Sequence, residues 1–236
     1  MKYIKKTGPP HSYKIWRSQV RGTGGEDYSQ LKNPQKADLH RNLLKEQGWL
    51  CAYTMQRIDL DTSHIEHIKP ESVCRLEQVG LDLDYNNLVT CFPREGMKKR
   101  NRYGAPKKDH WWKNDGVDFV SPLHPMCEKR FSFQLDGTIS AVNHHFAATQ
   151  TIQLLGLSHP TLTDVRKRVI DQFLYGPSGD DPLSHAQAHR AKDDICTRSA
   201  DGCFHEFCVA IRNALDEYLK NLQRVARRRK FARRKT

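Results

Sequence analysis

The sequence predicts an α+β fold that is mostly helical. Four short stretches have the alternation or apolar character of strands, while most other segments carry apolar residues at helical spacing. The clearest helical spacing belongs to the expected last helix, whose apolar face carries Phe204, Phe207, Ile211, Leu215, Leu219 and Leu222. With 236 residues the chain can bury a core, so one domain and a small module with a helical extension both fit.

The composition favours a polyanionic partner and a reducing compartment. A net charge of +12 suits phosphates, because Lys and Arg neutralise them and release counterions. Seven cysteines without a dense framework are typical of the cytoplasm. The sequence has no run of about 18 apolar residues, so we expect no membrane span. Its first residues include Lys2, Lys5 and Lys6 and lack the apolar core of a signal peptide. We therefore expect a cytoplasmic protein without a membrane partner.

The chain divides into four predicted regions. Residues 1–32 form an N-terminal arm, broken by glycines at positions 22, 24 and 25. Residues 33–115 form a module that contains the polar motifs. Residues 116–222 form a small β hairpin plus a helical C-terminal region, and residues 223–236 form a basic tail.

The module is expected to begin with a helix that has Asn33 as N-cap, Pro34 at its first position and Gly48 at its end. A strand should end just before Pro70, which cannot continue a central ladder. Residues 87–91 are apolar enough for a second strand, and residues 97–113 should contain a helix.

The second half predicts a hairpin followed by helices. Residues 130–134 alternate, Asp136 and Gly137 signal the turn, and residues 138–142 return. Helices are expected at about 145–155 and 161–175, the second capped by Thr161 or Thr163. Residues 176–184 read as a linker before the last helix.

Chemistry is most concentrated in the stretch from His64 to Pro70. It holds two imidazoles and a carboxylate, and these groups suit a divalent cation and proton transfer from water. Because side chains alternate along a strand, His64 and Glu66 share a face and His67 points away. Glu66 and His67 therefore converge only where the strand ends, and together they predict a hydrolytic site.

This stretch resembles the first motif of HNH endonucleases, in which an acidic residue followed by His ends the first strand of a ββα-metal finger. The resemblance to the PtuB branch of that family extends over residues 43–54 and 84–91, and also over residues 1–6 and 151–157. It implies a central HNH ββα-metal finger with a helical surround and a C-terminal helical extension. Residues 33–115 then correspond to the nuclease module.

The resemblance also implies roles for particular residues. His67 is the expected general base, and Glu66 the expected ligand of one divalent ion, Mg²⁺ or Mn²⁺. Asn87, with Asn86 as its alternative, braces the loop that orients His67. The usual third ligand falls at Gly104, which cannot ligate, so we expect Asp109 instead, with Asn101 and His110 nearby and His64 as an alternative second ligand.

The chain departs from the family at its zinc knuckle. Thr54 and Tyr103 stand where two of the four cysteines usually lie, which leaves Cys51 and Cys91. A structural zinc needs four ligands, so we expect none and interpret both cysteines as small buried residues. We interpret Cys196, Cys203 and Cys208, with His205, in the same way rather than as a second metal site.

Two basic segments are candidates for binding nucleic acid. In the first, Lys107 and its neighbours would hold the substrate backbone, while Trp111 and Trp112 either stack on bases or belong to the core. The second is the tail, either a solvated helix end or a nucleic-acid arm. The candidates are Arg100, Arg102, Lys107, Lys108, Arg227, Arg228 and Arg229.

The sequence thus predicts a metal-dependent endonuclease that hydrolyses DNA or RNA, tRNA included. The resemblance implies an effector of Septu-type anti-phage or retron systems, with a PtuA-like ATPase and, in retrons, a reverse transcriptase with its RNA-linked DNA as partners. A degenerate HNH subunit that binds nucleic acid or holds an assembly together, without catalysis, is the alternative.

Overall fold

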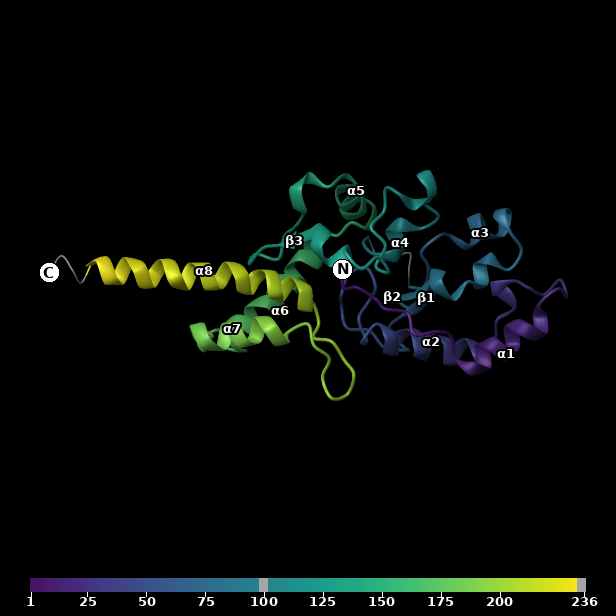
Figure 1. The fold of residues 1–236 in the computed structure, drawn as a ribbon, viewed down its shortest axis with the longest axis horizontal. Helices are drawn as coiled ribbons and strands as arrows, with labels where there is room; N and C mark the ends of the chain where they lie inside the picture. The colour runs from purple at the N-terminus through teal and green to yellow at the C-terminus, as the bar shows by residue number, and fades with distance from the viewer. Residues whose placement is uncertain (98–101, 233–236) are drawn as a thin grey trace.

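The computed structural model describes residues 1–97 and 102–232, with side chains through Arg228. Helix α8 (Cys208–Ala232) projects at one end of an elongated molecule, and α1 (His11–Val20) lies at the other (Figure 1). Among the described residues, no helix combines the length and apolarity needed to cross a membrane.

The half that contains the predicted site is built on a pair of antiparallel strands. Strand β1 (His64–His67) pairs with β2 (Leu88–Cys91), and His67 lies opposite Leu88. Both strands were predicted at these positions. Helix α2 (Gln35–Glu46) packs against β2, and α3 (Glu71–Glu77) follows β1 directly. Between the strands lie the 3-10 turns η2 (Leu81–Leu83) and η3 (Tyr85–Asn87), with η1 (Tyr28–Gln30) ahead of α2.

The two faces of this strand pair meet different apolar clusters. Ile65 and Leu88 join a smaller cluster with Tyr13, Tyr28 and Leu39 from the first part of the chain. Val89 and Cys91, on the other face, join the main core, which continues into the second half. Residues 1–32, expected as an arm, contribute to both clusters, and Met1 and Tyr13 are fully buried.

The second half forms the predicted hairpin and helices. Strand β3 (Phe131–Phe133) pairs with β4 (Ile139–Ala141) across a turn in which Gly137 has a φ of 81°. Helices α5 (Phe146–Leu155), α6 (Pro160–Tyr175) and α7 (His185–Asp194) follow. The 3-10 turns are η5 (Asn114–Gly116), η6 (Cys127–Arg130) and η7 (Val142–His144). Helices α6 and α7 pack along the first half of α8.

Four local predictions were wrong. Pro34, not Asn33, is the N-cap of α2, whose first turn bonds to the carbonyls of Lys32 and Pro34. Helix α6 begins at Pro160, so neither threonine caps it. Helix α7 was missed because it is mostly polar, although its capping box of Ser184 and Gln187 was visible in the sequence. Phe204 and Phe207 precede α8, and Phe207 has a φ of 52°.

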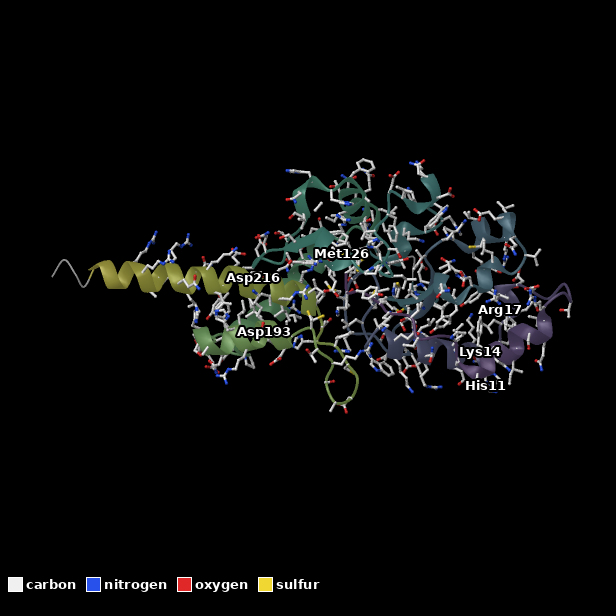
Figure 2. All side chains as sticks on the ribbon, in the orientation of Figure 1. His11, Lys14, Arg17, Met126, Asp193 and Asp216 are labelled. Atoms are coloured by element: carbon white, nitrogen blue, oxygen red, sulfur yellow. The ribbon has the colours of Figure 1, made fainter. Side chains whose placement is uncertain are left out.

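The basic tail continues α8 without a break at residue 222. Lys192 of α7 forms an ion pair with Asp216 of α8 at 2.5 Å; Figure 2 labels Asp216 and, on α7, Asp193. Beyond this contact, the side chains of residues 223–228 are exposed. Arg227 and Arg228 therefore face solvent, whereas the side chain of Arg229 lies outside the described part of the molecule.

Candidate hydrolytic site

A pocket of about 680 Å³ opens at the end of β1. Both Glu66 and His67 line it, as expected of residues at the point where a strand ends. The other lining segments are far away in the sequence, around the start of α2 and around α4 (Ala105–Lys108). The other lining residues include Tyr28, Ser29, Lys32, Lys36, Glu71, Glu95, Pro106, Asp109 and His110.

His67 is a buried imidazole with a defined tautomer. Its Nε2 lies 2.8 Å from the carbonyl oxygen of Asp82, and a carbonyl can only accept, so Nε2 carries the proton. The ring of Tyr28 packs edge-on against it, with the centroids 4.6 Å apart. Burial lowers the pKa of His67, so the ring is neutral near pH 7 and its Nδ1 has a lone pair. This is the form that a general base requires.

The loop that holds His67 is secured by Arg75 of α3. Arg75 donates to the carboxylates of Asp82 at 3.2 Å and Asp27 at 2.7 Å, and it also bonds to Glu71. Asp82 is fully buried and accepts a second bond, from the backbone N–H of Tyr28 at 2.9 Å. The guanidinium therefore ties together both segments that contact the His67 ring. The three carboxylates lie close enough for a metal site, but this cation already bridges them.

Asn87 braces the residue that follows the strand. Its Oδ1 accepts from the N–H of Lys69 at 2.7 Å, and its Nδ2 donates to the carbonyl of Lys69 at 2.8 Å. Asn86 is exposed and makes neither contact. Asn87 lines a different pocket from His67, so its geometry is that of a positioning residue rather than a catalytic one.

His64 and Glu66 form a pair with an unusual hydrogen-bonding requirement. The Nδ1 of the buried His64 donates to the carbonyl of Pro93, which leaves Nε2 with a lone pair in the neutral ring. That atom lies 3.3 Å from Oε2 of Glu66, which also only accepts. A proton on Nε2 or a divalent cation would satisfy both atoms. An imidazole anchored by a carbonyl beside a carboxylate therefore fits a metal ion.

Lys108, expected to bind nucleic acid, is buried instead. Only 2% of the residue is exposed, and its Nζ lies 3.4 Å from Oε1 of Glu66 and 3.1 Å from the carbonyl oxygen of His67. Its neighbour Lys107 is exposed and donates to the carbonyl of Gln153 in α5 at 2.7 Å. Lys107 is also absent from the pocket lining, so the structure does not place it where the substrate was expected.

The predicted set of three metal ligands is not assembled. Asp109 lines the pocket, but its side chain is 72% exposed, and its Oδ1 lies 3.5 Å from Nε2 of His110. Among the described residues, Glu66, His64 and Asp109 do not come together as a group of three ligands. The reason lies in the backbone: α4 has a single turn, and Asp109 ends it with a φ of 46°.

The expected finger helix in residues 97–113 is correspondingly short in the described part of the chain. Arg102 precedes α4 and is exposed, while Arg100 and Asn101 lie outside the described residues. Trp111 and Trp112 are partly buried against the main core, which favours a packing role.

Three pocket residues were missed by the sequence analysis. Tyr28 contacts His67, and Lys32 and Lys36 bring positive charge to the pocket lining. The Nζ of Lys36 lies 5.1 Å from the centroid of the Tyr28 ring. The two lysines around the start of α2 are evident in the sequence. No local pattern, however, predicts that this segment lies beside β1.

The residues at the positions compared with a zinc knuckle lie in the core. Cys51 and Cys91 are buried, and Sγ of Cys51 accepts from the backbone N–H of Phe92 at 3.4 Å. Burial raises the pKa of Cys51, but hydrogen bonds from Cys91, Thr54 and the Phe92 backbone outweigh it and lower the pKa to about 6. In the second half, Cys208 is buried at the start of α8 beside Cys196, while Cys203 bonds locally to the carbonyl of Asp201.

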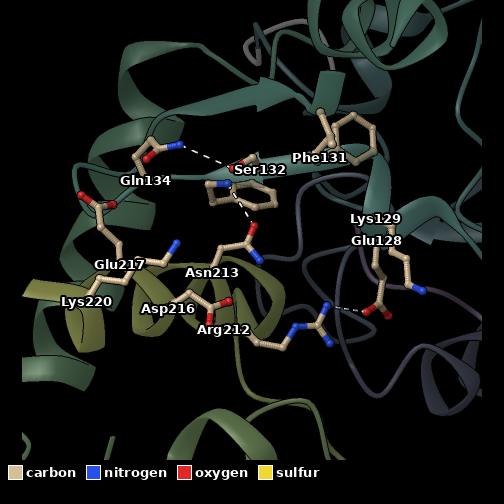
Figure 3. Close-up of a pocket in the computed structure, with 12 residues that line it drawn as sticks. Glu128, Lys129, Phe131, Ser132, Gln134, Arg212, Asn213, Asp216, Glu217 and Lys220 are labelled. Carbon is tan, nitrogen blue, oxygen red and sulfur yellow. Dashed lines mark hydrogen bonds and ion pairs between the residues drawn. The ribbon is translucent and has the colours of Figure 1, made fainter. Parts of the chain in front are cut away.

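A second pocket, of about 500 Å³, lies between β3 and α8 (Figure 3). Its polar groups largely serve to attach the hairpin to the helix. Arg212 forms an ion pair with Glu128 at 3.0 Å, and Asn213 accepts from the N–H of Phe133 at 3.1 Å. None of the residues predicted for the hydrolytic site lines this pocket.

Taken together, an antiparallel strand pair followed by a short helix, with a carboxylate and two imidazoles on the first strand, is suited to metal-assisted hydrolysis. Over 135 residues the chain is 33% identical to a protein of Vibrio cholerae serotype O1 biovar El Tor named "Retron Vc95 putative HNH endonuclease". The match covers 55% of this chain and 62% of that protein, so it spans less than two thirds of the relative. No protein-family model matches the chain.

Proposed function

We propose that this protein is a metal-dependent HNH endonuclease that hydrolyses phosphodiester bonds of DNA or RNA. The observation that carries the proposal is the tautomer of His67: its Nε2 donates to the carbonyl of Asp82, so its Nδ1 has the lone pair that a proton from water needs. The similarity to the retron protein supports the same activity. A basic net charge of +12 agrees with a polyanionic substrate.

Several residues in and around the pocket have a role in this mechanism. His67 accepts the proton of the attacking water, with Asn87 and Asp82 holding the strand end and the ring in place. Lys32 and Lys36, which line the pocket, attract the nucleic-acid backbone. His64 and Glu66 would hold a Mg²⁺ or Mn²⁺ ion, which supplies positive charge against the negative charge that builds on the phosphate.

We further propose the cellular setting that the PtuB resemblance implies. The chain acts as the effector of a bacterial anti-phage system of the Septu or retron type, together with a PtuA-like ATPase and, in a retron, the reverse transcriptase with its RNA-linked DNA. The name of the Vibrio cholerae relative supports the retron setting. Structured RNA such as tRNA and phage DNA are both compatible substrates, because the pocket offers cations for phosphates.

Replacement of His67 by alanine tests the proposed reaction. DNA and RNA integrity are measured after phage challenge in cells that express the wild type or His67→Ala beside the ATPase. Loss of a general base should reduce cleavage about 10²- to 10⁴-fold. His189→Ala is the matched control, because His189 is exposed on α7, in the other half of the molecule. Equal cleavage by the wild type and His67→Ala would remove His67 from the mechanism.

One observation favours the non-catalytic alternative. Asp109 is apart from Glu66, and a lysine ammonium contacts the Glu66 carboxylate, as expected of a site that has lost part of its ligand set. A degenerate HNH subunit would bind nucleic acid and support the assembly without cutting. In the same experiment, it predicts equal protection by the wild type and His67→Ala, with both polymers intact.

A further inference from the structure

The burial of Lys108 needs an explanation, because lysines are rarely buried unless they are paired. The residue ends α4, whose position is set by the backbone: Gly104 N–H donates to the carbonyl of Leu155 in α5 at 2.7 Å. The Lys108 side chain then reaches Glu66 and the carbonyl of His67 in β1. Helix α4 is therefore held by α5 through Gly104 and contacts the candidate site through Lys108.

The two oxygens of Glu66 contact different groups. Oε1 lies 3.4 Å from the Lys108 ammonium, whereas Oε2 lies 3.3 Å from Nε2 of His64. The Glu66 side chain is 12% exposed and that of Lys108 only 1%, so water screens this ion pair poorly. Lys108 thus holds the carboxylate in the orientation that brings Oε2 to His64.

We propose that Lys108 is a built-in cation of this site, which positions Glu66 and weakens the binding of a divalent ion by the His64 and Glu66 pair. The inference rests on the proposed function, because it concerns the same metal ligands. Its physical basis is the repulsion between two cations that share one carboxylate in a poorly screened setting. The ammonium also compensates the charge of Glu66 when no metal is bound, which a buried carboxylate requires.

The test is a Mn²⁺ titration of the full chain without nucleic acid, in which free Mn²⁺ is followed by electron paramagnetic resonance. Lys108→Met keeps most of the aliphatic side chain and removes the charge, and it should bind Mn²⁺ about tenfold more tightly than the wild type. Adding Glu66→Gln to Lys108→Met should abolish this gain in Mn²⁺ affinity. The matched control is Lys192→Met, which breaks the remote ion pair with Asp216 and should leave Mn²⁺ affinity unchanged.

Thermal unfolding provides a second readout. Without metal, Lys108→Met should unfold at a lower temperature than the wild type, because Glu66 loses its ammonium partner. Added Mn²⁺ should then raise the unfolding temperature more in Lys108→Met than in the wild type. If the Met variant does not fold, Lys108→Gln is titrated in its place with the same expectation.

Mn²⁺ affinity that is unchanged or weaker in the folded Lys108 variant would overturn the inference, as would a gain that persists in Glu66→Gln. These readouts require no cleavage, so the two proposals can fail separately. A protein that cuts nothing but shows the Glu66-dependent gain loses only the proposed function. A protein that cuts but lacks the gain loses only the role of Lys108.

Discussion

Both halves of the molecule bury apolar side chains, but the buried polar groups are concentrated in the first half. Of the eleven buried polar or charged side chains among the described residues, nine lie before residue 110, and the other two are Thr151 and Arg166. The interior of the second half, made of α5, α6 and α8 residues of the main core, is otherwise apolar. A buried polar group costs free energy unless it is paired. The first half bears this cost around the candidate site, whereas the second half mainly supports it.

Arg166 is the buried charged side chain among the described residues of the second half. It is 1% exposed, donates to the carbonyls of Gly137 and Leu157, and packs over the ring of Phe133. Burial lowers its pKa to about 10, which still leaves it charged at neutral pH. Its partners are backbone carbonyls, so it holds the β3–β4 turn against α6. In the first half, by contrast, charged groups such as Lys108 and Arg75 bond to other functional side chains.

The largest effect should come from the scaffold half. Leu215 on α8 is fully buried, and Leu215→Ala should lower the free energy of unfolding by about 2–5 kcal/mol, because the core loses contacts and gains a cavity. Urea unfolding measures the change. Val225→Ala is the control on the same helix: Val225 is 46% exposed, and its loss should stay within about 0.5 kcal/mol. Similar losses at both positions would contradict this account of α8.

A smaller effect is expected from the Arg75 clamp of the site half. Arg75→Met should reduce single-turnover cleavage about 10- to 100-fold, because the loop that orients His67 loses its bridge to Asp27, Glu71 and Asp82.

Arg75→Lys, which keeps the charge, should recover part of the rate, a result that loss of stability alone does not produce. The control is Arg41→Met, which breaks an exposed pair with Asp38 on α2. An unchanged rate in a folded Arg75→Met protein would remove Arg75 from the site.

The smallest effect should come from the projecting end of α8. Replacing exposed Arg227 and Arg228 by glutamine should leave stability unchanged and weaken nucleic-acid binding at low salt. If both side chains contact phosphates, the slope of log affinity against log salt should fall by about two. Fluorescence anisotropy at several salt concentrations measures it. Arg190→Gln, on the exposed face of α7, is the control, and an unchanged slope in the double variant would show that this end is only a solvated helix.

Local patterns in the sequence were sufficient for much of the fold and part of the candidate site. The alternation around His64 to His67 and the stop at Pro70 predicted β1, and the hairpin turn at Asp136 and Gly137 predicted β3 and β4. Glu66 and His67 do line one pocket at the strand end. These features depend on neighbours in the chain, whose spacing alone determines which side chains share a face.

The roles of two adjacent lysines could not be predicted in this way. Lys107 and Lys108 look equivalent in the sequence, yet one is exposed against α5 and the other is buried against Glu66. The same limit applies to Arg75 and Lys36, whose partners lie in other segments of the chain. Whether a charge meets solvent or a carboxylate depends on what packs against it across the core. That packing is a property of the tertiary structure, because contacts between distant segments leave no periodic signal in either one.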